Sequence, residues 1–437
     1  MRLTESDLAS WIAAAPAGAA GSFVAEAGAT TAFLERGARL LADLPARPDR
    51  DESEAASATE ISRALHDARE RFLAAHAERV YELLTDELST PLRVEGLLER
   101  AAERFPGLVP DAATLAAEGE RRLADKDGAE IAQGQLLAHV LSSPRAGAHL
   151  LQAMLRPTAA ALERLDDFRA TAELDLDTVL VRREGRVGTL ELRNPRHLNA
   201  EDDTTLAATE TAVDLILLDP QIEVGVMRGG VVDHPRYAGR RIFGAGLNLT
   251  RLYRGQISFL FFIVRDLGYV NKIYRGLGDI EKVWIAGVET YAIGGACQLL
   301  HVMDHVMAER GARLYLPARK EGIIPGASPL RLPRSVGERL ARQAIMSGRE
   351  FAAGTPEADL ICDEVVEAGE VDAAIARRAE LLTSSGLVNA AANRRAMRAG
   401  QEPLDLFRSY MAGYARDQAQ CHFSPELVRN LEHHWNR

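Results

Sequence analysis

Two glycine-rich stretches decide how this chain folds: FGAGLNL at residues 243–249 and IGGACQ at residues 293–298. Each is predicted to follow a strand and to open a helix. Glycine lets the backbone turn tightly and leaves no side chain between the amide groups and a ligand. Either turn alone is typical of an ordinary tight loop. Together they can direct two backbone N–H groups at one developing negative oxygen, and the positive end of the helix after Gly294 and Gly295 adds to the attraction.

The sequence around these turns alternates between strand and helix patterns. Residues 178–181 and 187–192 are predicted to form two strands around a turn at Glu184 and Gly185. Further along, we expect a helix over 207–218 and strands over 224–227 and 282–288. This alternation predicts an α/β fold in which helices cover a sheet.

The first part of the chain has a different pattern, with apolar residues repeating at helical spacing. One example is the set Leu73, Ala77, Val80 and Leu84. We predict an all-helical N-terminal domain over residues 1–175 and a catalytic domain over 176–437, with a C-terminal helical region from Glu370 onward. The N-terminal part shows no catalytic constellation, so a structural or oligomerisation role is expected there.

Composition excludes several classes of protein. The 437 residues carry 52 Lys and Arg against 63 Asp and Glu, a net charge of −11. A chain without a basic surplus does not favour nucleic acid as a partner. No apolar run approaches the ~18 residues of a membrane span, and the first residues show no secretory signal. The three cysteines, Cys297, Cys362 and Cys421, have no metal-ligand spacing, which fits a cytoplasmic protein.

A third motif lies downstream of the second turn: LYLPARKEGIIPGA at residues 314–327, followed by LRLPR at 330–334. Upstream, VGTLELRNP at 187–195 is followed by LNA at 198–200. In this order, and with the two glycine turns, the motifs resemble the crotonase (enoyl-CoA hydratase/isomerase) superfamily. The resemblance implies a crotonase-like ββα superhelix, and it does not extend to the helical N-terminal domain.

The resemblance also implies roles for individual residues. It assigns the two oxyanion amides to Leu247, the residue after the Ala-Gly pair, and to Gly295. The residues expected around the bound acyl group are Ala245, Gly246, Gly294 and Ala296. The residues that match the family's adenine-contacting loop, and are therefore expected to bind coenzyme A, are Arg196, His197 and Leu198.

Two departures from the family pattern concern proton transfer. Hydratases carry glutamates at the positions occupied here by Gln298 and Ala318. A glutamine forms hydrogen bonds but exchanges no proton at neutral pH, and an alanine does neither. This argues against hydration of a double bond. Glu321 is expected to be a surface or helix charge rather than a substitute.

These replacements and the helical extension resemble one branch of the superfamily, as do ISFLFF at 257–262 and DLGYVNKIYRGL at 266–277. This branch comprises cofactor-independent dioxygenases of glycopeptide-antibiotic biosynthesis that act on arylacetyl-CoA thioesters. The resemblance implies conversion of 3,5-dihydroxyphenylacetyl-CoA and dioxygen to 3,5-dihydroxyphenylglyoxylate and coenzyme A, through an enolate and a Cα peroxide. It implies no metal or organic cofactor, and a homo-oligomer, either a trimer or a hexamer.

Other activities of the same fold remain open. A thioesterase, an isomerase or a decarboxylase would use the same oxyanion hole. A non-catalytic acyl-CoA-binding subunit would also lack the hydratase glutamates. The sequence does not name the base that removes the substrate proton.

Three polar side chains are candidates for binding the substrate. Gln298 is tied in sequence to the second turn. Arg254 lies seven residues after Leu247, two turns along the helix that Leu247 is expected to open, and its alternative is an ordinary surface arginine. Glu191 points away from its strand neighbours and is either a ligand for a ring hydroxyl or a solvent-facing charge.

The pair His301 and His305 is the only spacing that suggests a metal ligand set. Two histidines four residues apart, without the glutamate of the zinc-protease motif or a third ligand, are weak support for a metal. Asp304 and His305 are expected to begin a strand instead. We therefore predict no metal site.

Overall fold

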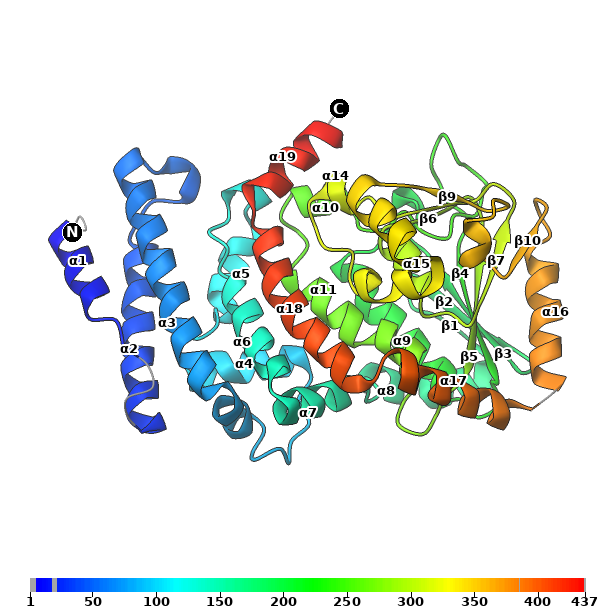
Figure 1. The fold of residues 1–437 in the computed structure, drawn as a ribbon, viewed down its shortest axis with the longest axis horizontal. Helices are drawn as coiled ribbons and strands as arrows, with labels where there is room; N and C mark the ends of the chain where they lie inside the picture. The colour runs from blue at the N-terminus through cyan, green and yellow to red at the C-terminus, as the bar shows by residue number, and fades with distance from the viewer. Residues whose placement is uncertain (1–4, 18–21, 385, 436–437) are drawn as a thin grey trace. The chain divides into compact units, whose positions relative to one another are not determined.

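A computed structural model describes residues 5–17, 22–384 and 386–435 of the chain (Figure 1). The chain forms two compact units. The first spans Met1–Met154, Tyr253–Phe259 and Leu404–Val428, and the second spans Leu155–Leu252, Leu260–Pro403 and Arg429–Arg437. The first segment of the helical unit ends at Met154, and two later segments also belong to this unit. The predicted domains, residues 1–175 and 176–437, stay a prediction.

The first unit is built from helices. They are α1 (Glu5–Ala13), α2 (Phe23–Ala42), α3 (Glu52–Leu84), α4 (Val94–Arg104), α5 (Ala112–Gly119), α6 (Ile131–Ser142), α7 (Pro144–Met154) and α18 (Leu404–His422). The apolar face predicted on α3, from Leu73 to Leu84, is buried. Helix α18 runs along α6 so closely that a side chain added at Gly134 would begin 2.5 Å from Ala419 Cβ (Figure 1). The distant sequence segments are therefore packed into one helical core.

The second unit contains a seven-stranded sheet in the order β1-β2-β3-β4-β5-β7-β10. Its strands are β1 (Glu173–Asp175), β2 (Val179–Glu184), β3 (Val187–Leu192), β4 (Val224–Gly229), β5 (Val283–Val288), β7 (His305–Glu309) and β10 (Glu364–Val366). β2 and β3 form the predicted antiparallel hairpin, and the strands from β3 to β10 are parallel. β4 and β5 are buried at every residue, as expected for central parallel strands covered on both faces.

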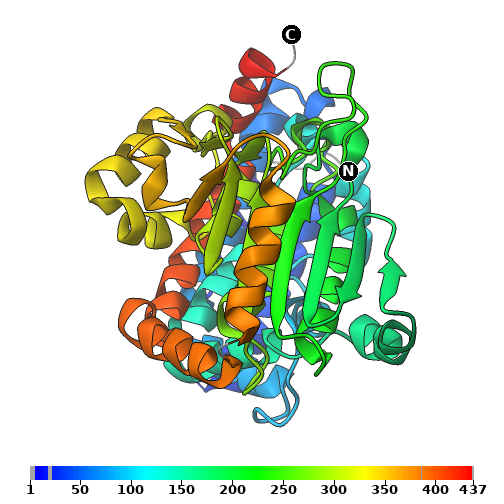
Figure 2. The same ribbon diagram turned by 90° about the vertical axis from the view of Figure 1, so that its right-hand side faces the viewer.

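Helices cover the two faces of this sheet, which confirms the predicted α/β class. α16 (Val371–Ser384) packs on one face, where Ile375 lies in an apolar cluster with residues of β4 and β5 (Figure 2). α9 (Asp203–Leu218) packs against β2 and β3. The other helices that lie wholly in this unit are α8 (Ala159–Thr171), α12 (Tyr269–Arg275), α13 (Gly295–Leu300), α14 (Ala318–Glu321), α15 (Ser328–Ser347) and α17 (Leu387–Gln401).

Three helices run across a boundary between the units: α10 (Leu249–Tyr253), α11 (Phe259–Leu267) and α19 (Pro425–His434). A second, small sheet has the order β6-β8-β9, with β6 (Tyr291–Ile293), β8 (Arg313–Tyr315) and β9 (Phe351–Ala352). β6 ends at the second glycine turn. In the part of the chain that the structure describes, no helix is long and apolar enough to cross a membrane.

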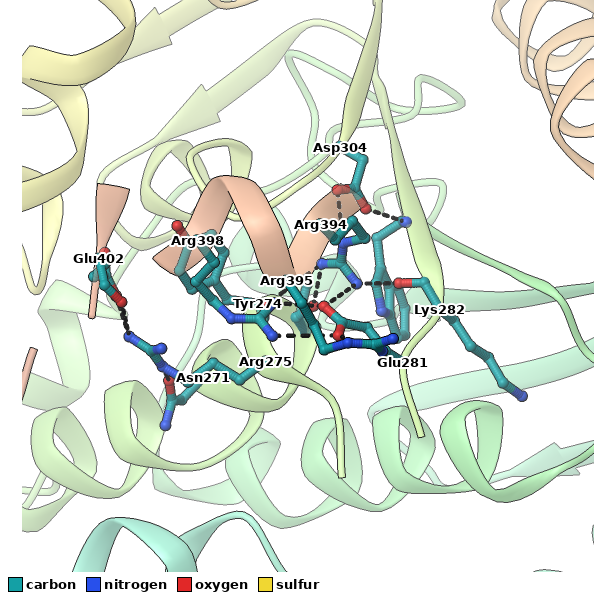
Figure 3. A network of polar contacts seen from close by, with 12 residues as sticks. Asn271, Tyr274, Arg275, Glu281, Lys282, Asp304, Arg394, Arg395, Arg398 and Glu402 are labelled. Carbon is teal, nitrogen blue, oxygen red and sulfur yellow. Dashed lines mark hydrogen bonds and ion pairs between the residues drawn. The ribbon is translucent and has the colours of Figure 1, made fainter. Parts of the chain in front are cut away.

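A group of arginines fixes α17 to the core of the second unit, and we call it the C-terminal arginine cluster. Figure 3 shows Arg275, Arg394 and Arg398 of this cluster. Its members are Arg275, Arg331, Arg334, Arg394 and Arg398, with the carboxylates of Glu281, Asp304 and Glu402. Arg394 Nε lies 2.8 Å from Asp304 Oδ1. Glu402, fully buried, accepts hydrogen bonds from Arg275, Arg331 and Arg334. The C-terminal helices predicted from Glu370 onward are therefore present, and α17 is held by ion pairs.

Candidate active site

The two glycine turns lie directly against each other. Gly244 N–H donates to Tyr291 O at 3.2 Å, and Ile293 N–H donates to Gly244 O at 3.0 Å. A side chain at Gly246, where φ is +81°, would begin 2.8 Å from Ile293 O and 3.3 Å from Gly295 N. The second turn follows strand β6 and opens helix α13, as predicted. The first turn pairs through isolated bridges rather than following a regular strand, so that part of the prediction is wrong.

Each turn presents an amide that is not used by the fold. Neither the Leu247 N–H nor the Gly295 N–H donates a hydrogen bond to any residue that the structure describes. Gly295 is the first residue of α13, where no intrahelical acceptor exists. Two unused N–H groups on neighbouring turns, one of them at a helix start, are the kind of donor that an oxyanion requires.

Behind the turns lies a polar group that we call the site cluster. It consists of the buried residues Glu201, Arg265, Asp266 and Tyr269 and the half-buried Gln298. Glu201 N–H donates to Gly246 O at 2.7 Å, and Glu201 O accepts from Asn248 N–H at 2.8 Å. The backbone of Glu201 therefore holds Leu247 between these two bonds. A side chain at Gly295 would begin 2.3 Å from Glu201 Oε2, so only glycine fits there.

Arg265 connects the site cluster to the second turn. Its Nε and Nη2 atoms lie 2.9 and 3.0 Å from the two carboxylate oxygens of Glu201, a bidentate pair. Nη2 also donates to Gly295 O at 2.8 Å, and Nη1 donates to Asp266 Oδ1 at 3.2 Å. One guanidinium thus fixes the carboxylate behind the first turn and the carbonyl of the second.

Burial and charge act in opposite directions on these groups. Burial is the largest single effect and would lower the pKa of Arg265, but the acidic groups around it, Glu201 first, together outweigh burial and raise that pKa above its ordinary value. Burial raises the pKa of Asp266, an effect that Arg265 partly offsets. Burial also holds the pKa of Tyr269 well above its ordinary value, so its hydroxyl donates to Glu201 and stays protonated at neutral pH.

Gln298 lies within this cluster. Its Oε1 accepts a hydrogen bond from Arg265 Nη1 at 3.1 Å. Arginine only donates, so the amide oxygen must face it, and the Nε2 group is left to donate elsewhere. Gln298 can therefore offer a fixed neutral donor to a ligand oxygen, whereas a glutamate here would act as an acid or a base.

A cavity of about 260 Å³ opens beside the turns and reaches Ala245 and Ile293. Its remaining lining residues are Leu198, Arg236, Tyr237, Tyr291, Arg313, Tyr315 and Glu350. Leu198, predicted to contact coenzyme A, has a left-handed backbone with φ +55°, and its carbonyl accepts from Ala245 N–H at 3.1 Å. Arg196 and His197 are exposed on the short turn before it. Three tyrosines and two arginines suit a ligand with aromatic and anionic parts.

Comparison with known proteins identifies the family of this chain. The family described as enoyl-CoA hydratase/isomerase matches residues 182–413, more than half of the chain. This chain belongs to the enoyl-CoA hydratase/isomerase family. It is 46% identical over 398 residues to (3,5-dihydroxyphenyl)acetyl-CoA 1,2-dioxygenase of Amycolatopsis orientalis, which covers 89% of this chain and 91% of that protein. The resemblance inferred from the motifs is thereby confirmed.

More distant relatives match a smaller share of the chain. Short-chain-enoyl-CoA hydratase of Clostridium acetobutylicum is 28% identical over 200 residues, covering 45% of this chain and 72% of the hydratase. A solved enoyl-CoA hydratase/isomerase from Xanthobacter autotrophicus has a TM-score of 0.50 at 20% identity, covering 59% of this chain and 94% of that one. This last likeness shows the family fold.

The third motif of the family follows β8 and closes over the second turn. Gly294 N–H donates to Tyr315 O at 2.8 Å. Ala318, at the position of the hydratase glutamate, and Glu321 both lie in the four-residue helix α14. Glu321 is only 6% exposed, so the expectation of a surface charge is wrong, although it does lie in a helix. Burial raises the pKa of Glu321 to about 7.

Two predicted substrate ligands lie elsewhere. Helix α10 ends at Tyr253, so Arg254 does not continue a helix opened by Leu247, and that expectation is wrong. Arg254 is exposed and belongs to the first compact unit. Glu191 points away from its buried strand neighbours, as predicted, and its carboxylate binds Arg241 at 2.7 Å and Arg193 at 3.3 Å. A role for either residue in binding substrate stays a prediction.

The two histidines lie at the end of a helix and at the start of a strand. His301 caps α13, and burial lowers its pKa to about 3. His305 is the first residue of β7, so the strand predicted there is confirmed. Among the described residues, no three His, Cys, Asp or Glu side chains are grouped as metal ligands.

Sequence analysis did not identify Glu201, Arg265, Asp266 or Tyr269 as site residues. One signal was present: Arg265 and Asp266 stand directly after the apolar stretch from Phe259 to Val264. Charged residues at the end of such a buried helix are rare unless they are paired, which marks them as candidates for a buried ionic site.

Proposed function

We propose that this chain is a dioxygenase that converts 3,5-dihydroxyphenylacetyl-CoA and dioxygen to 3,5-dihydroxyphenylglyoxylate and coenzyme A. The observation that carries the proposal is the likeness to the Amycolatopsis orientalis enzyme, which covers 89% of this chain, whereas the Clostridium acetobutylicum hydratase covers 45%. The pair of unused amides at Leu247 and Gly295, together with Gln298 and Ala318 in place of the hydratase glutamates, supports it.

The first step is formation of an enolate. The thioester oxygen binds between the Leu247 and Gly295 N–H groups, with Ala245, Gly246, Gly294 and Ala296 around the acyl group. An arylacetyl thioester has an acidic α-proton because its carbanion is delocalised into both the ring and the carbonyl. Removing one oxyanion donor typically costs about 3 kcal/mol of transition-state stabilisation.

The second stage consumes dioxygen. The electron-rich enolate reduces dioxygen and forms a peroxide at Cα. The distal peroxide oxygen attacks the thioester carbonyl carbon, and the C–S bond breaks to release coenzyme A. The O–O bond then cleaves as the remaining Cα hydrogen leaves as a proton, so both oxygen atoms end in the arylglyoxylate. The proposal includes dioxygen as a substrate and no metal or organic cofactor.

The proposal also includes contacts to the ring of the substrate and to the coenzyme A chain. The Gln298 amide N–H group donates to a ring hydroxyl, with Arg265 holding it from behind. The coenzyme A chain runs through the cavity lined by Leu198, Tyr237 and Tyr315, toward the exposed loop of Arg196 and His197. A cytoplasmic homo-oligomer, a trimer or a hexamer, completes the proposal.

Isotope labelling tests this function. Purified chain and 3,5-dihydroxyphenylacetyl-CoA are incubated under ¹⁸O₂, and the products are identified by mass spectrometry. We expect 3,5-dihydroxyphenylglyoxylate with two ¹⁸O atoms. Unlabelled 3,5-dihydroxyphenylacetate would indicate a thioesterase instead, and an unchanged thioester that remains bound would indicate a binding subunit.

A further inference from the structure

Glu321 is a buried carboxyl group for which the fold provides no partner. It is 6% exposed, and its carboxylate makes no hydrogen bond or ion pair with any residue that the structure describes. A buried charge without a partner is costly, so such a group is retained where its protonation has a use. The steps proposed above leave one group unnamed: the acceptor of the substrate α-proton.

The segment that carries Glu321 closes over the second glycine turn at both of its ends. Pro317 Cδ would lie 4.0 Å from a Cβ at Gly294. At the other end, a side chain at Gly326 would begin 2.4 Å from Gln298 Oε1 and 2.5 Å from Asp266 Oδ2. Glu321 lies between these two contacts in the sequence, as the last residue of α14.

Glu321 lies three residues after Ala318, the position at which the hydratases have their glutamate. Residues three apart share a helix face, so the two positions lie on the same face of α14. Ala318 is itself buried.

The charged groups on neighbouring elements have partners of their own. Lys320 Nζ lies 5.7 Å above the Tyr315 ring, Arg331 of α15 binds Glu402, and Arg265 of α11 binds Glu201 and Asp266. Arg319 is exposed. Burial is the one cause that shifts the pKa of Glu321, and it brings that pKa to about 7, where a carboxylate accepts protons efficiently near neutral pH.

We propose that Glu321 is the base that removes the Cα proton of the acyl-CoA held by the Leu247 and Gly295 amides. The Cα–H bond breaks, its electron pair stays on Cα and delocalises onto the thioester oxygen, and the proton moves to the Glu321 carboxylate. This proposal rests on the proposed function, because it uses the same oxyanion amides and the same substrate.

Anaerobic hydrogen exchange isolates this step. Each protein is mixed with 3,5-dihydroxyphenylacetyl-CoA in D₂O without oxygen, and deuterium at Cα is followed by mass spectrometry. Glu321→Gln is expected to exchange about 100- to 10,000-fold more slowly than the wild type. The matched control is Glu338→Gln, an exposed glutamate on α15, which should exchange at the wild-type rate. Glu321→Asp is expected to recover part of the exchange.

A pH profile gives a second readout that a structural role would not change. The wild-type kcat/KM should rise with pH up to about 7 and then level, because the base must be ionised, and Glu321→Gln should show a low, flat profile. The proposal is overturned if Glu321→Gln exchanges within threefold of an active wild type, or if the wild-type profile is flat from pH 5 to 8. A wild type that neither exchanges deuterium nor consumes oxygen would instead overturn the proposed function.

Discussion

The second unit contains two buried ionic groups with the same chemistry and different roles. In the C-terminal arginine cluster, the Glu402 carboxylate accepts from three arginines, and the cluster fixes α17 and the chain after it to the core. In the site cluster, Arg265 binds Glu201 and the second turn, yet the N–H groups of Leu247, Gly295 and the Gln298 side chain have no acceptor among the residues that the structure describes.

This difference separates stability from function. A buried ion pair adds little stability over an apolar replacement, but removing one partner leaves a costly unpaired charge. We therefore expect the removal of one charged partner to destabilise the fold in either cluster. Only changes in the site cluster should alter turnover beyond their effect on folding.

The largest effect is expected for Arg265→Ala. The variant removes the cation that the buried Glu201 and Asp266 share, which costs about 3–5 kcal/mol of unfolding free energy. The turns lose the group that fixes their spacing, so kcat/KM should also fall by more than about 100-fold. Urea unfolding and turnover of the folded fraction measure the two effects. A stable variant with turnover within threefold of wild type would contradict the role given to the site cluster.

Glu402→Ala should destabilise the fold by about 3 kcal/mol at pH 7 while the folded molecules keep their turnover within about threefold. Burial opposes ionisation of Glu402, but Arg331 and Arg275 bring its pKa below the ordinary 4.5. Its stabilisation is therefore complete above that pH and is lost as the pH falls through the lowered pKa. Unfolding free energies of wild type and variant should converge in acid, and a constant difference from pH 7 to 3 would argue against the ion pairs.

For Glu321, the pH dependence of the unfolding free energy is opposite in sign to that of Glu402. In the wild type, the pKa of Glu321 is about 7 in the folded state and 4.5 ordinarily. Between these pH values the folded state keeps the Glu321 proton while the unfolded state loses it. The unfolding free energy of the wild type therefore falls as the pH rises from 4.5 to 7. The amide introduced by Glu321→Gln does not titrate, so the stability of the variant lacks this dependence. Between pH 4 and a pH above 7, the unfolding free energy of the variant should therefore gain about 3 kcal/mol on that of the wild type. A difference that is independent of pH would show that Glu321 is not buried as described.

Gln298→Ala should lower kcat/KM by about 10- to 100-fold, because it removes one hydrogen-bond donor to the substrate and one acceptor for Arg265. The unfolding free energy should change by less than about 1.5 kcal/mol. Steady-state kinetics and urea unfolding on the same preparation check this. Unchanged kinetics in a folded variant would remove Gln298 from the site.

Arg254→Ala is expected to have the smallest effect, a change within about 0.5 kcal/mol in stability, since the residue is exposed. Its kcat/KM, measured beside that of Arg265→Ala, decides which arginine serves the site. A loss of turnover in Arg254→Ala as large as that in Arg265→Ala would restore the role predicted from the sequence.

The parts of the site that depend on local sequence were predictable. Glycine conformation places the turns at residues 243–249 and 293–298, and the third motif follows the second turn as expected. The hairpin of β2 and β3 and the α/β class also follow from local patterns.

The side-chain partners were not predictable, because they join distant segments. Glu201 and Arg265 lie 64 residues apart, and only the fold brings them together. The burial of Glu321 depends on how α14 packs. The sequence of such a short helix does not show which of its faces is buried. The length of α10 was not predictable either. This helix ends at Tyr253, so no continuous helix connects Leu247 to Arg254.

Oxygen uptake tests the central claim most directly. Metal-free protein is mixed with 3,5-dihydroxyphenylacetyl-CoA, and dissolved oxygen and free thiol are followed together. A cofactor-independent dioxygenase predicts one dioxygen consumed for each thiol released. Thiol release without oxygen uptake would contradict it and indicate a thioesterase.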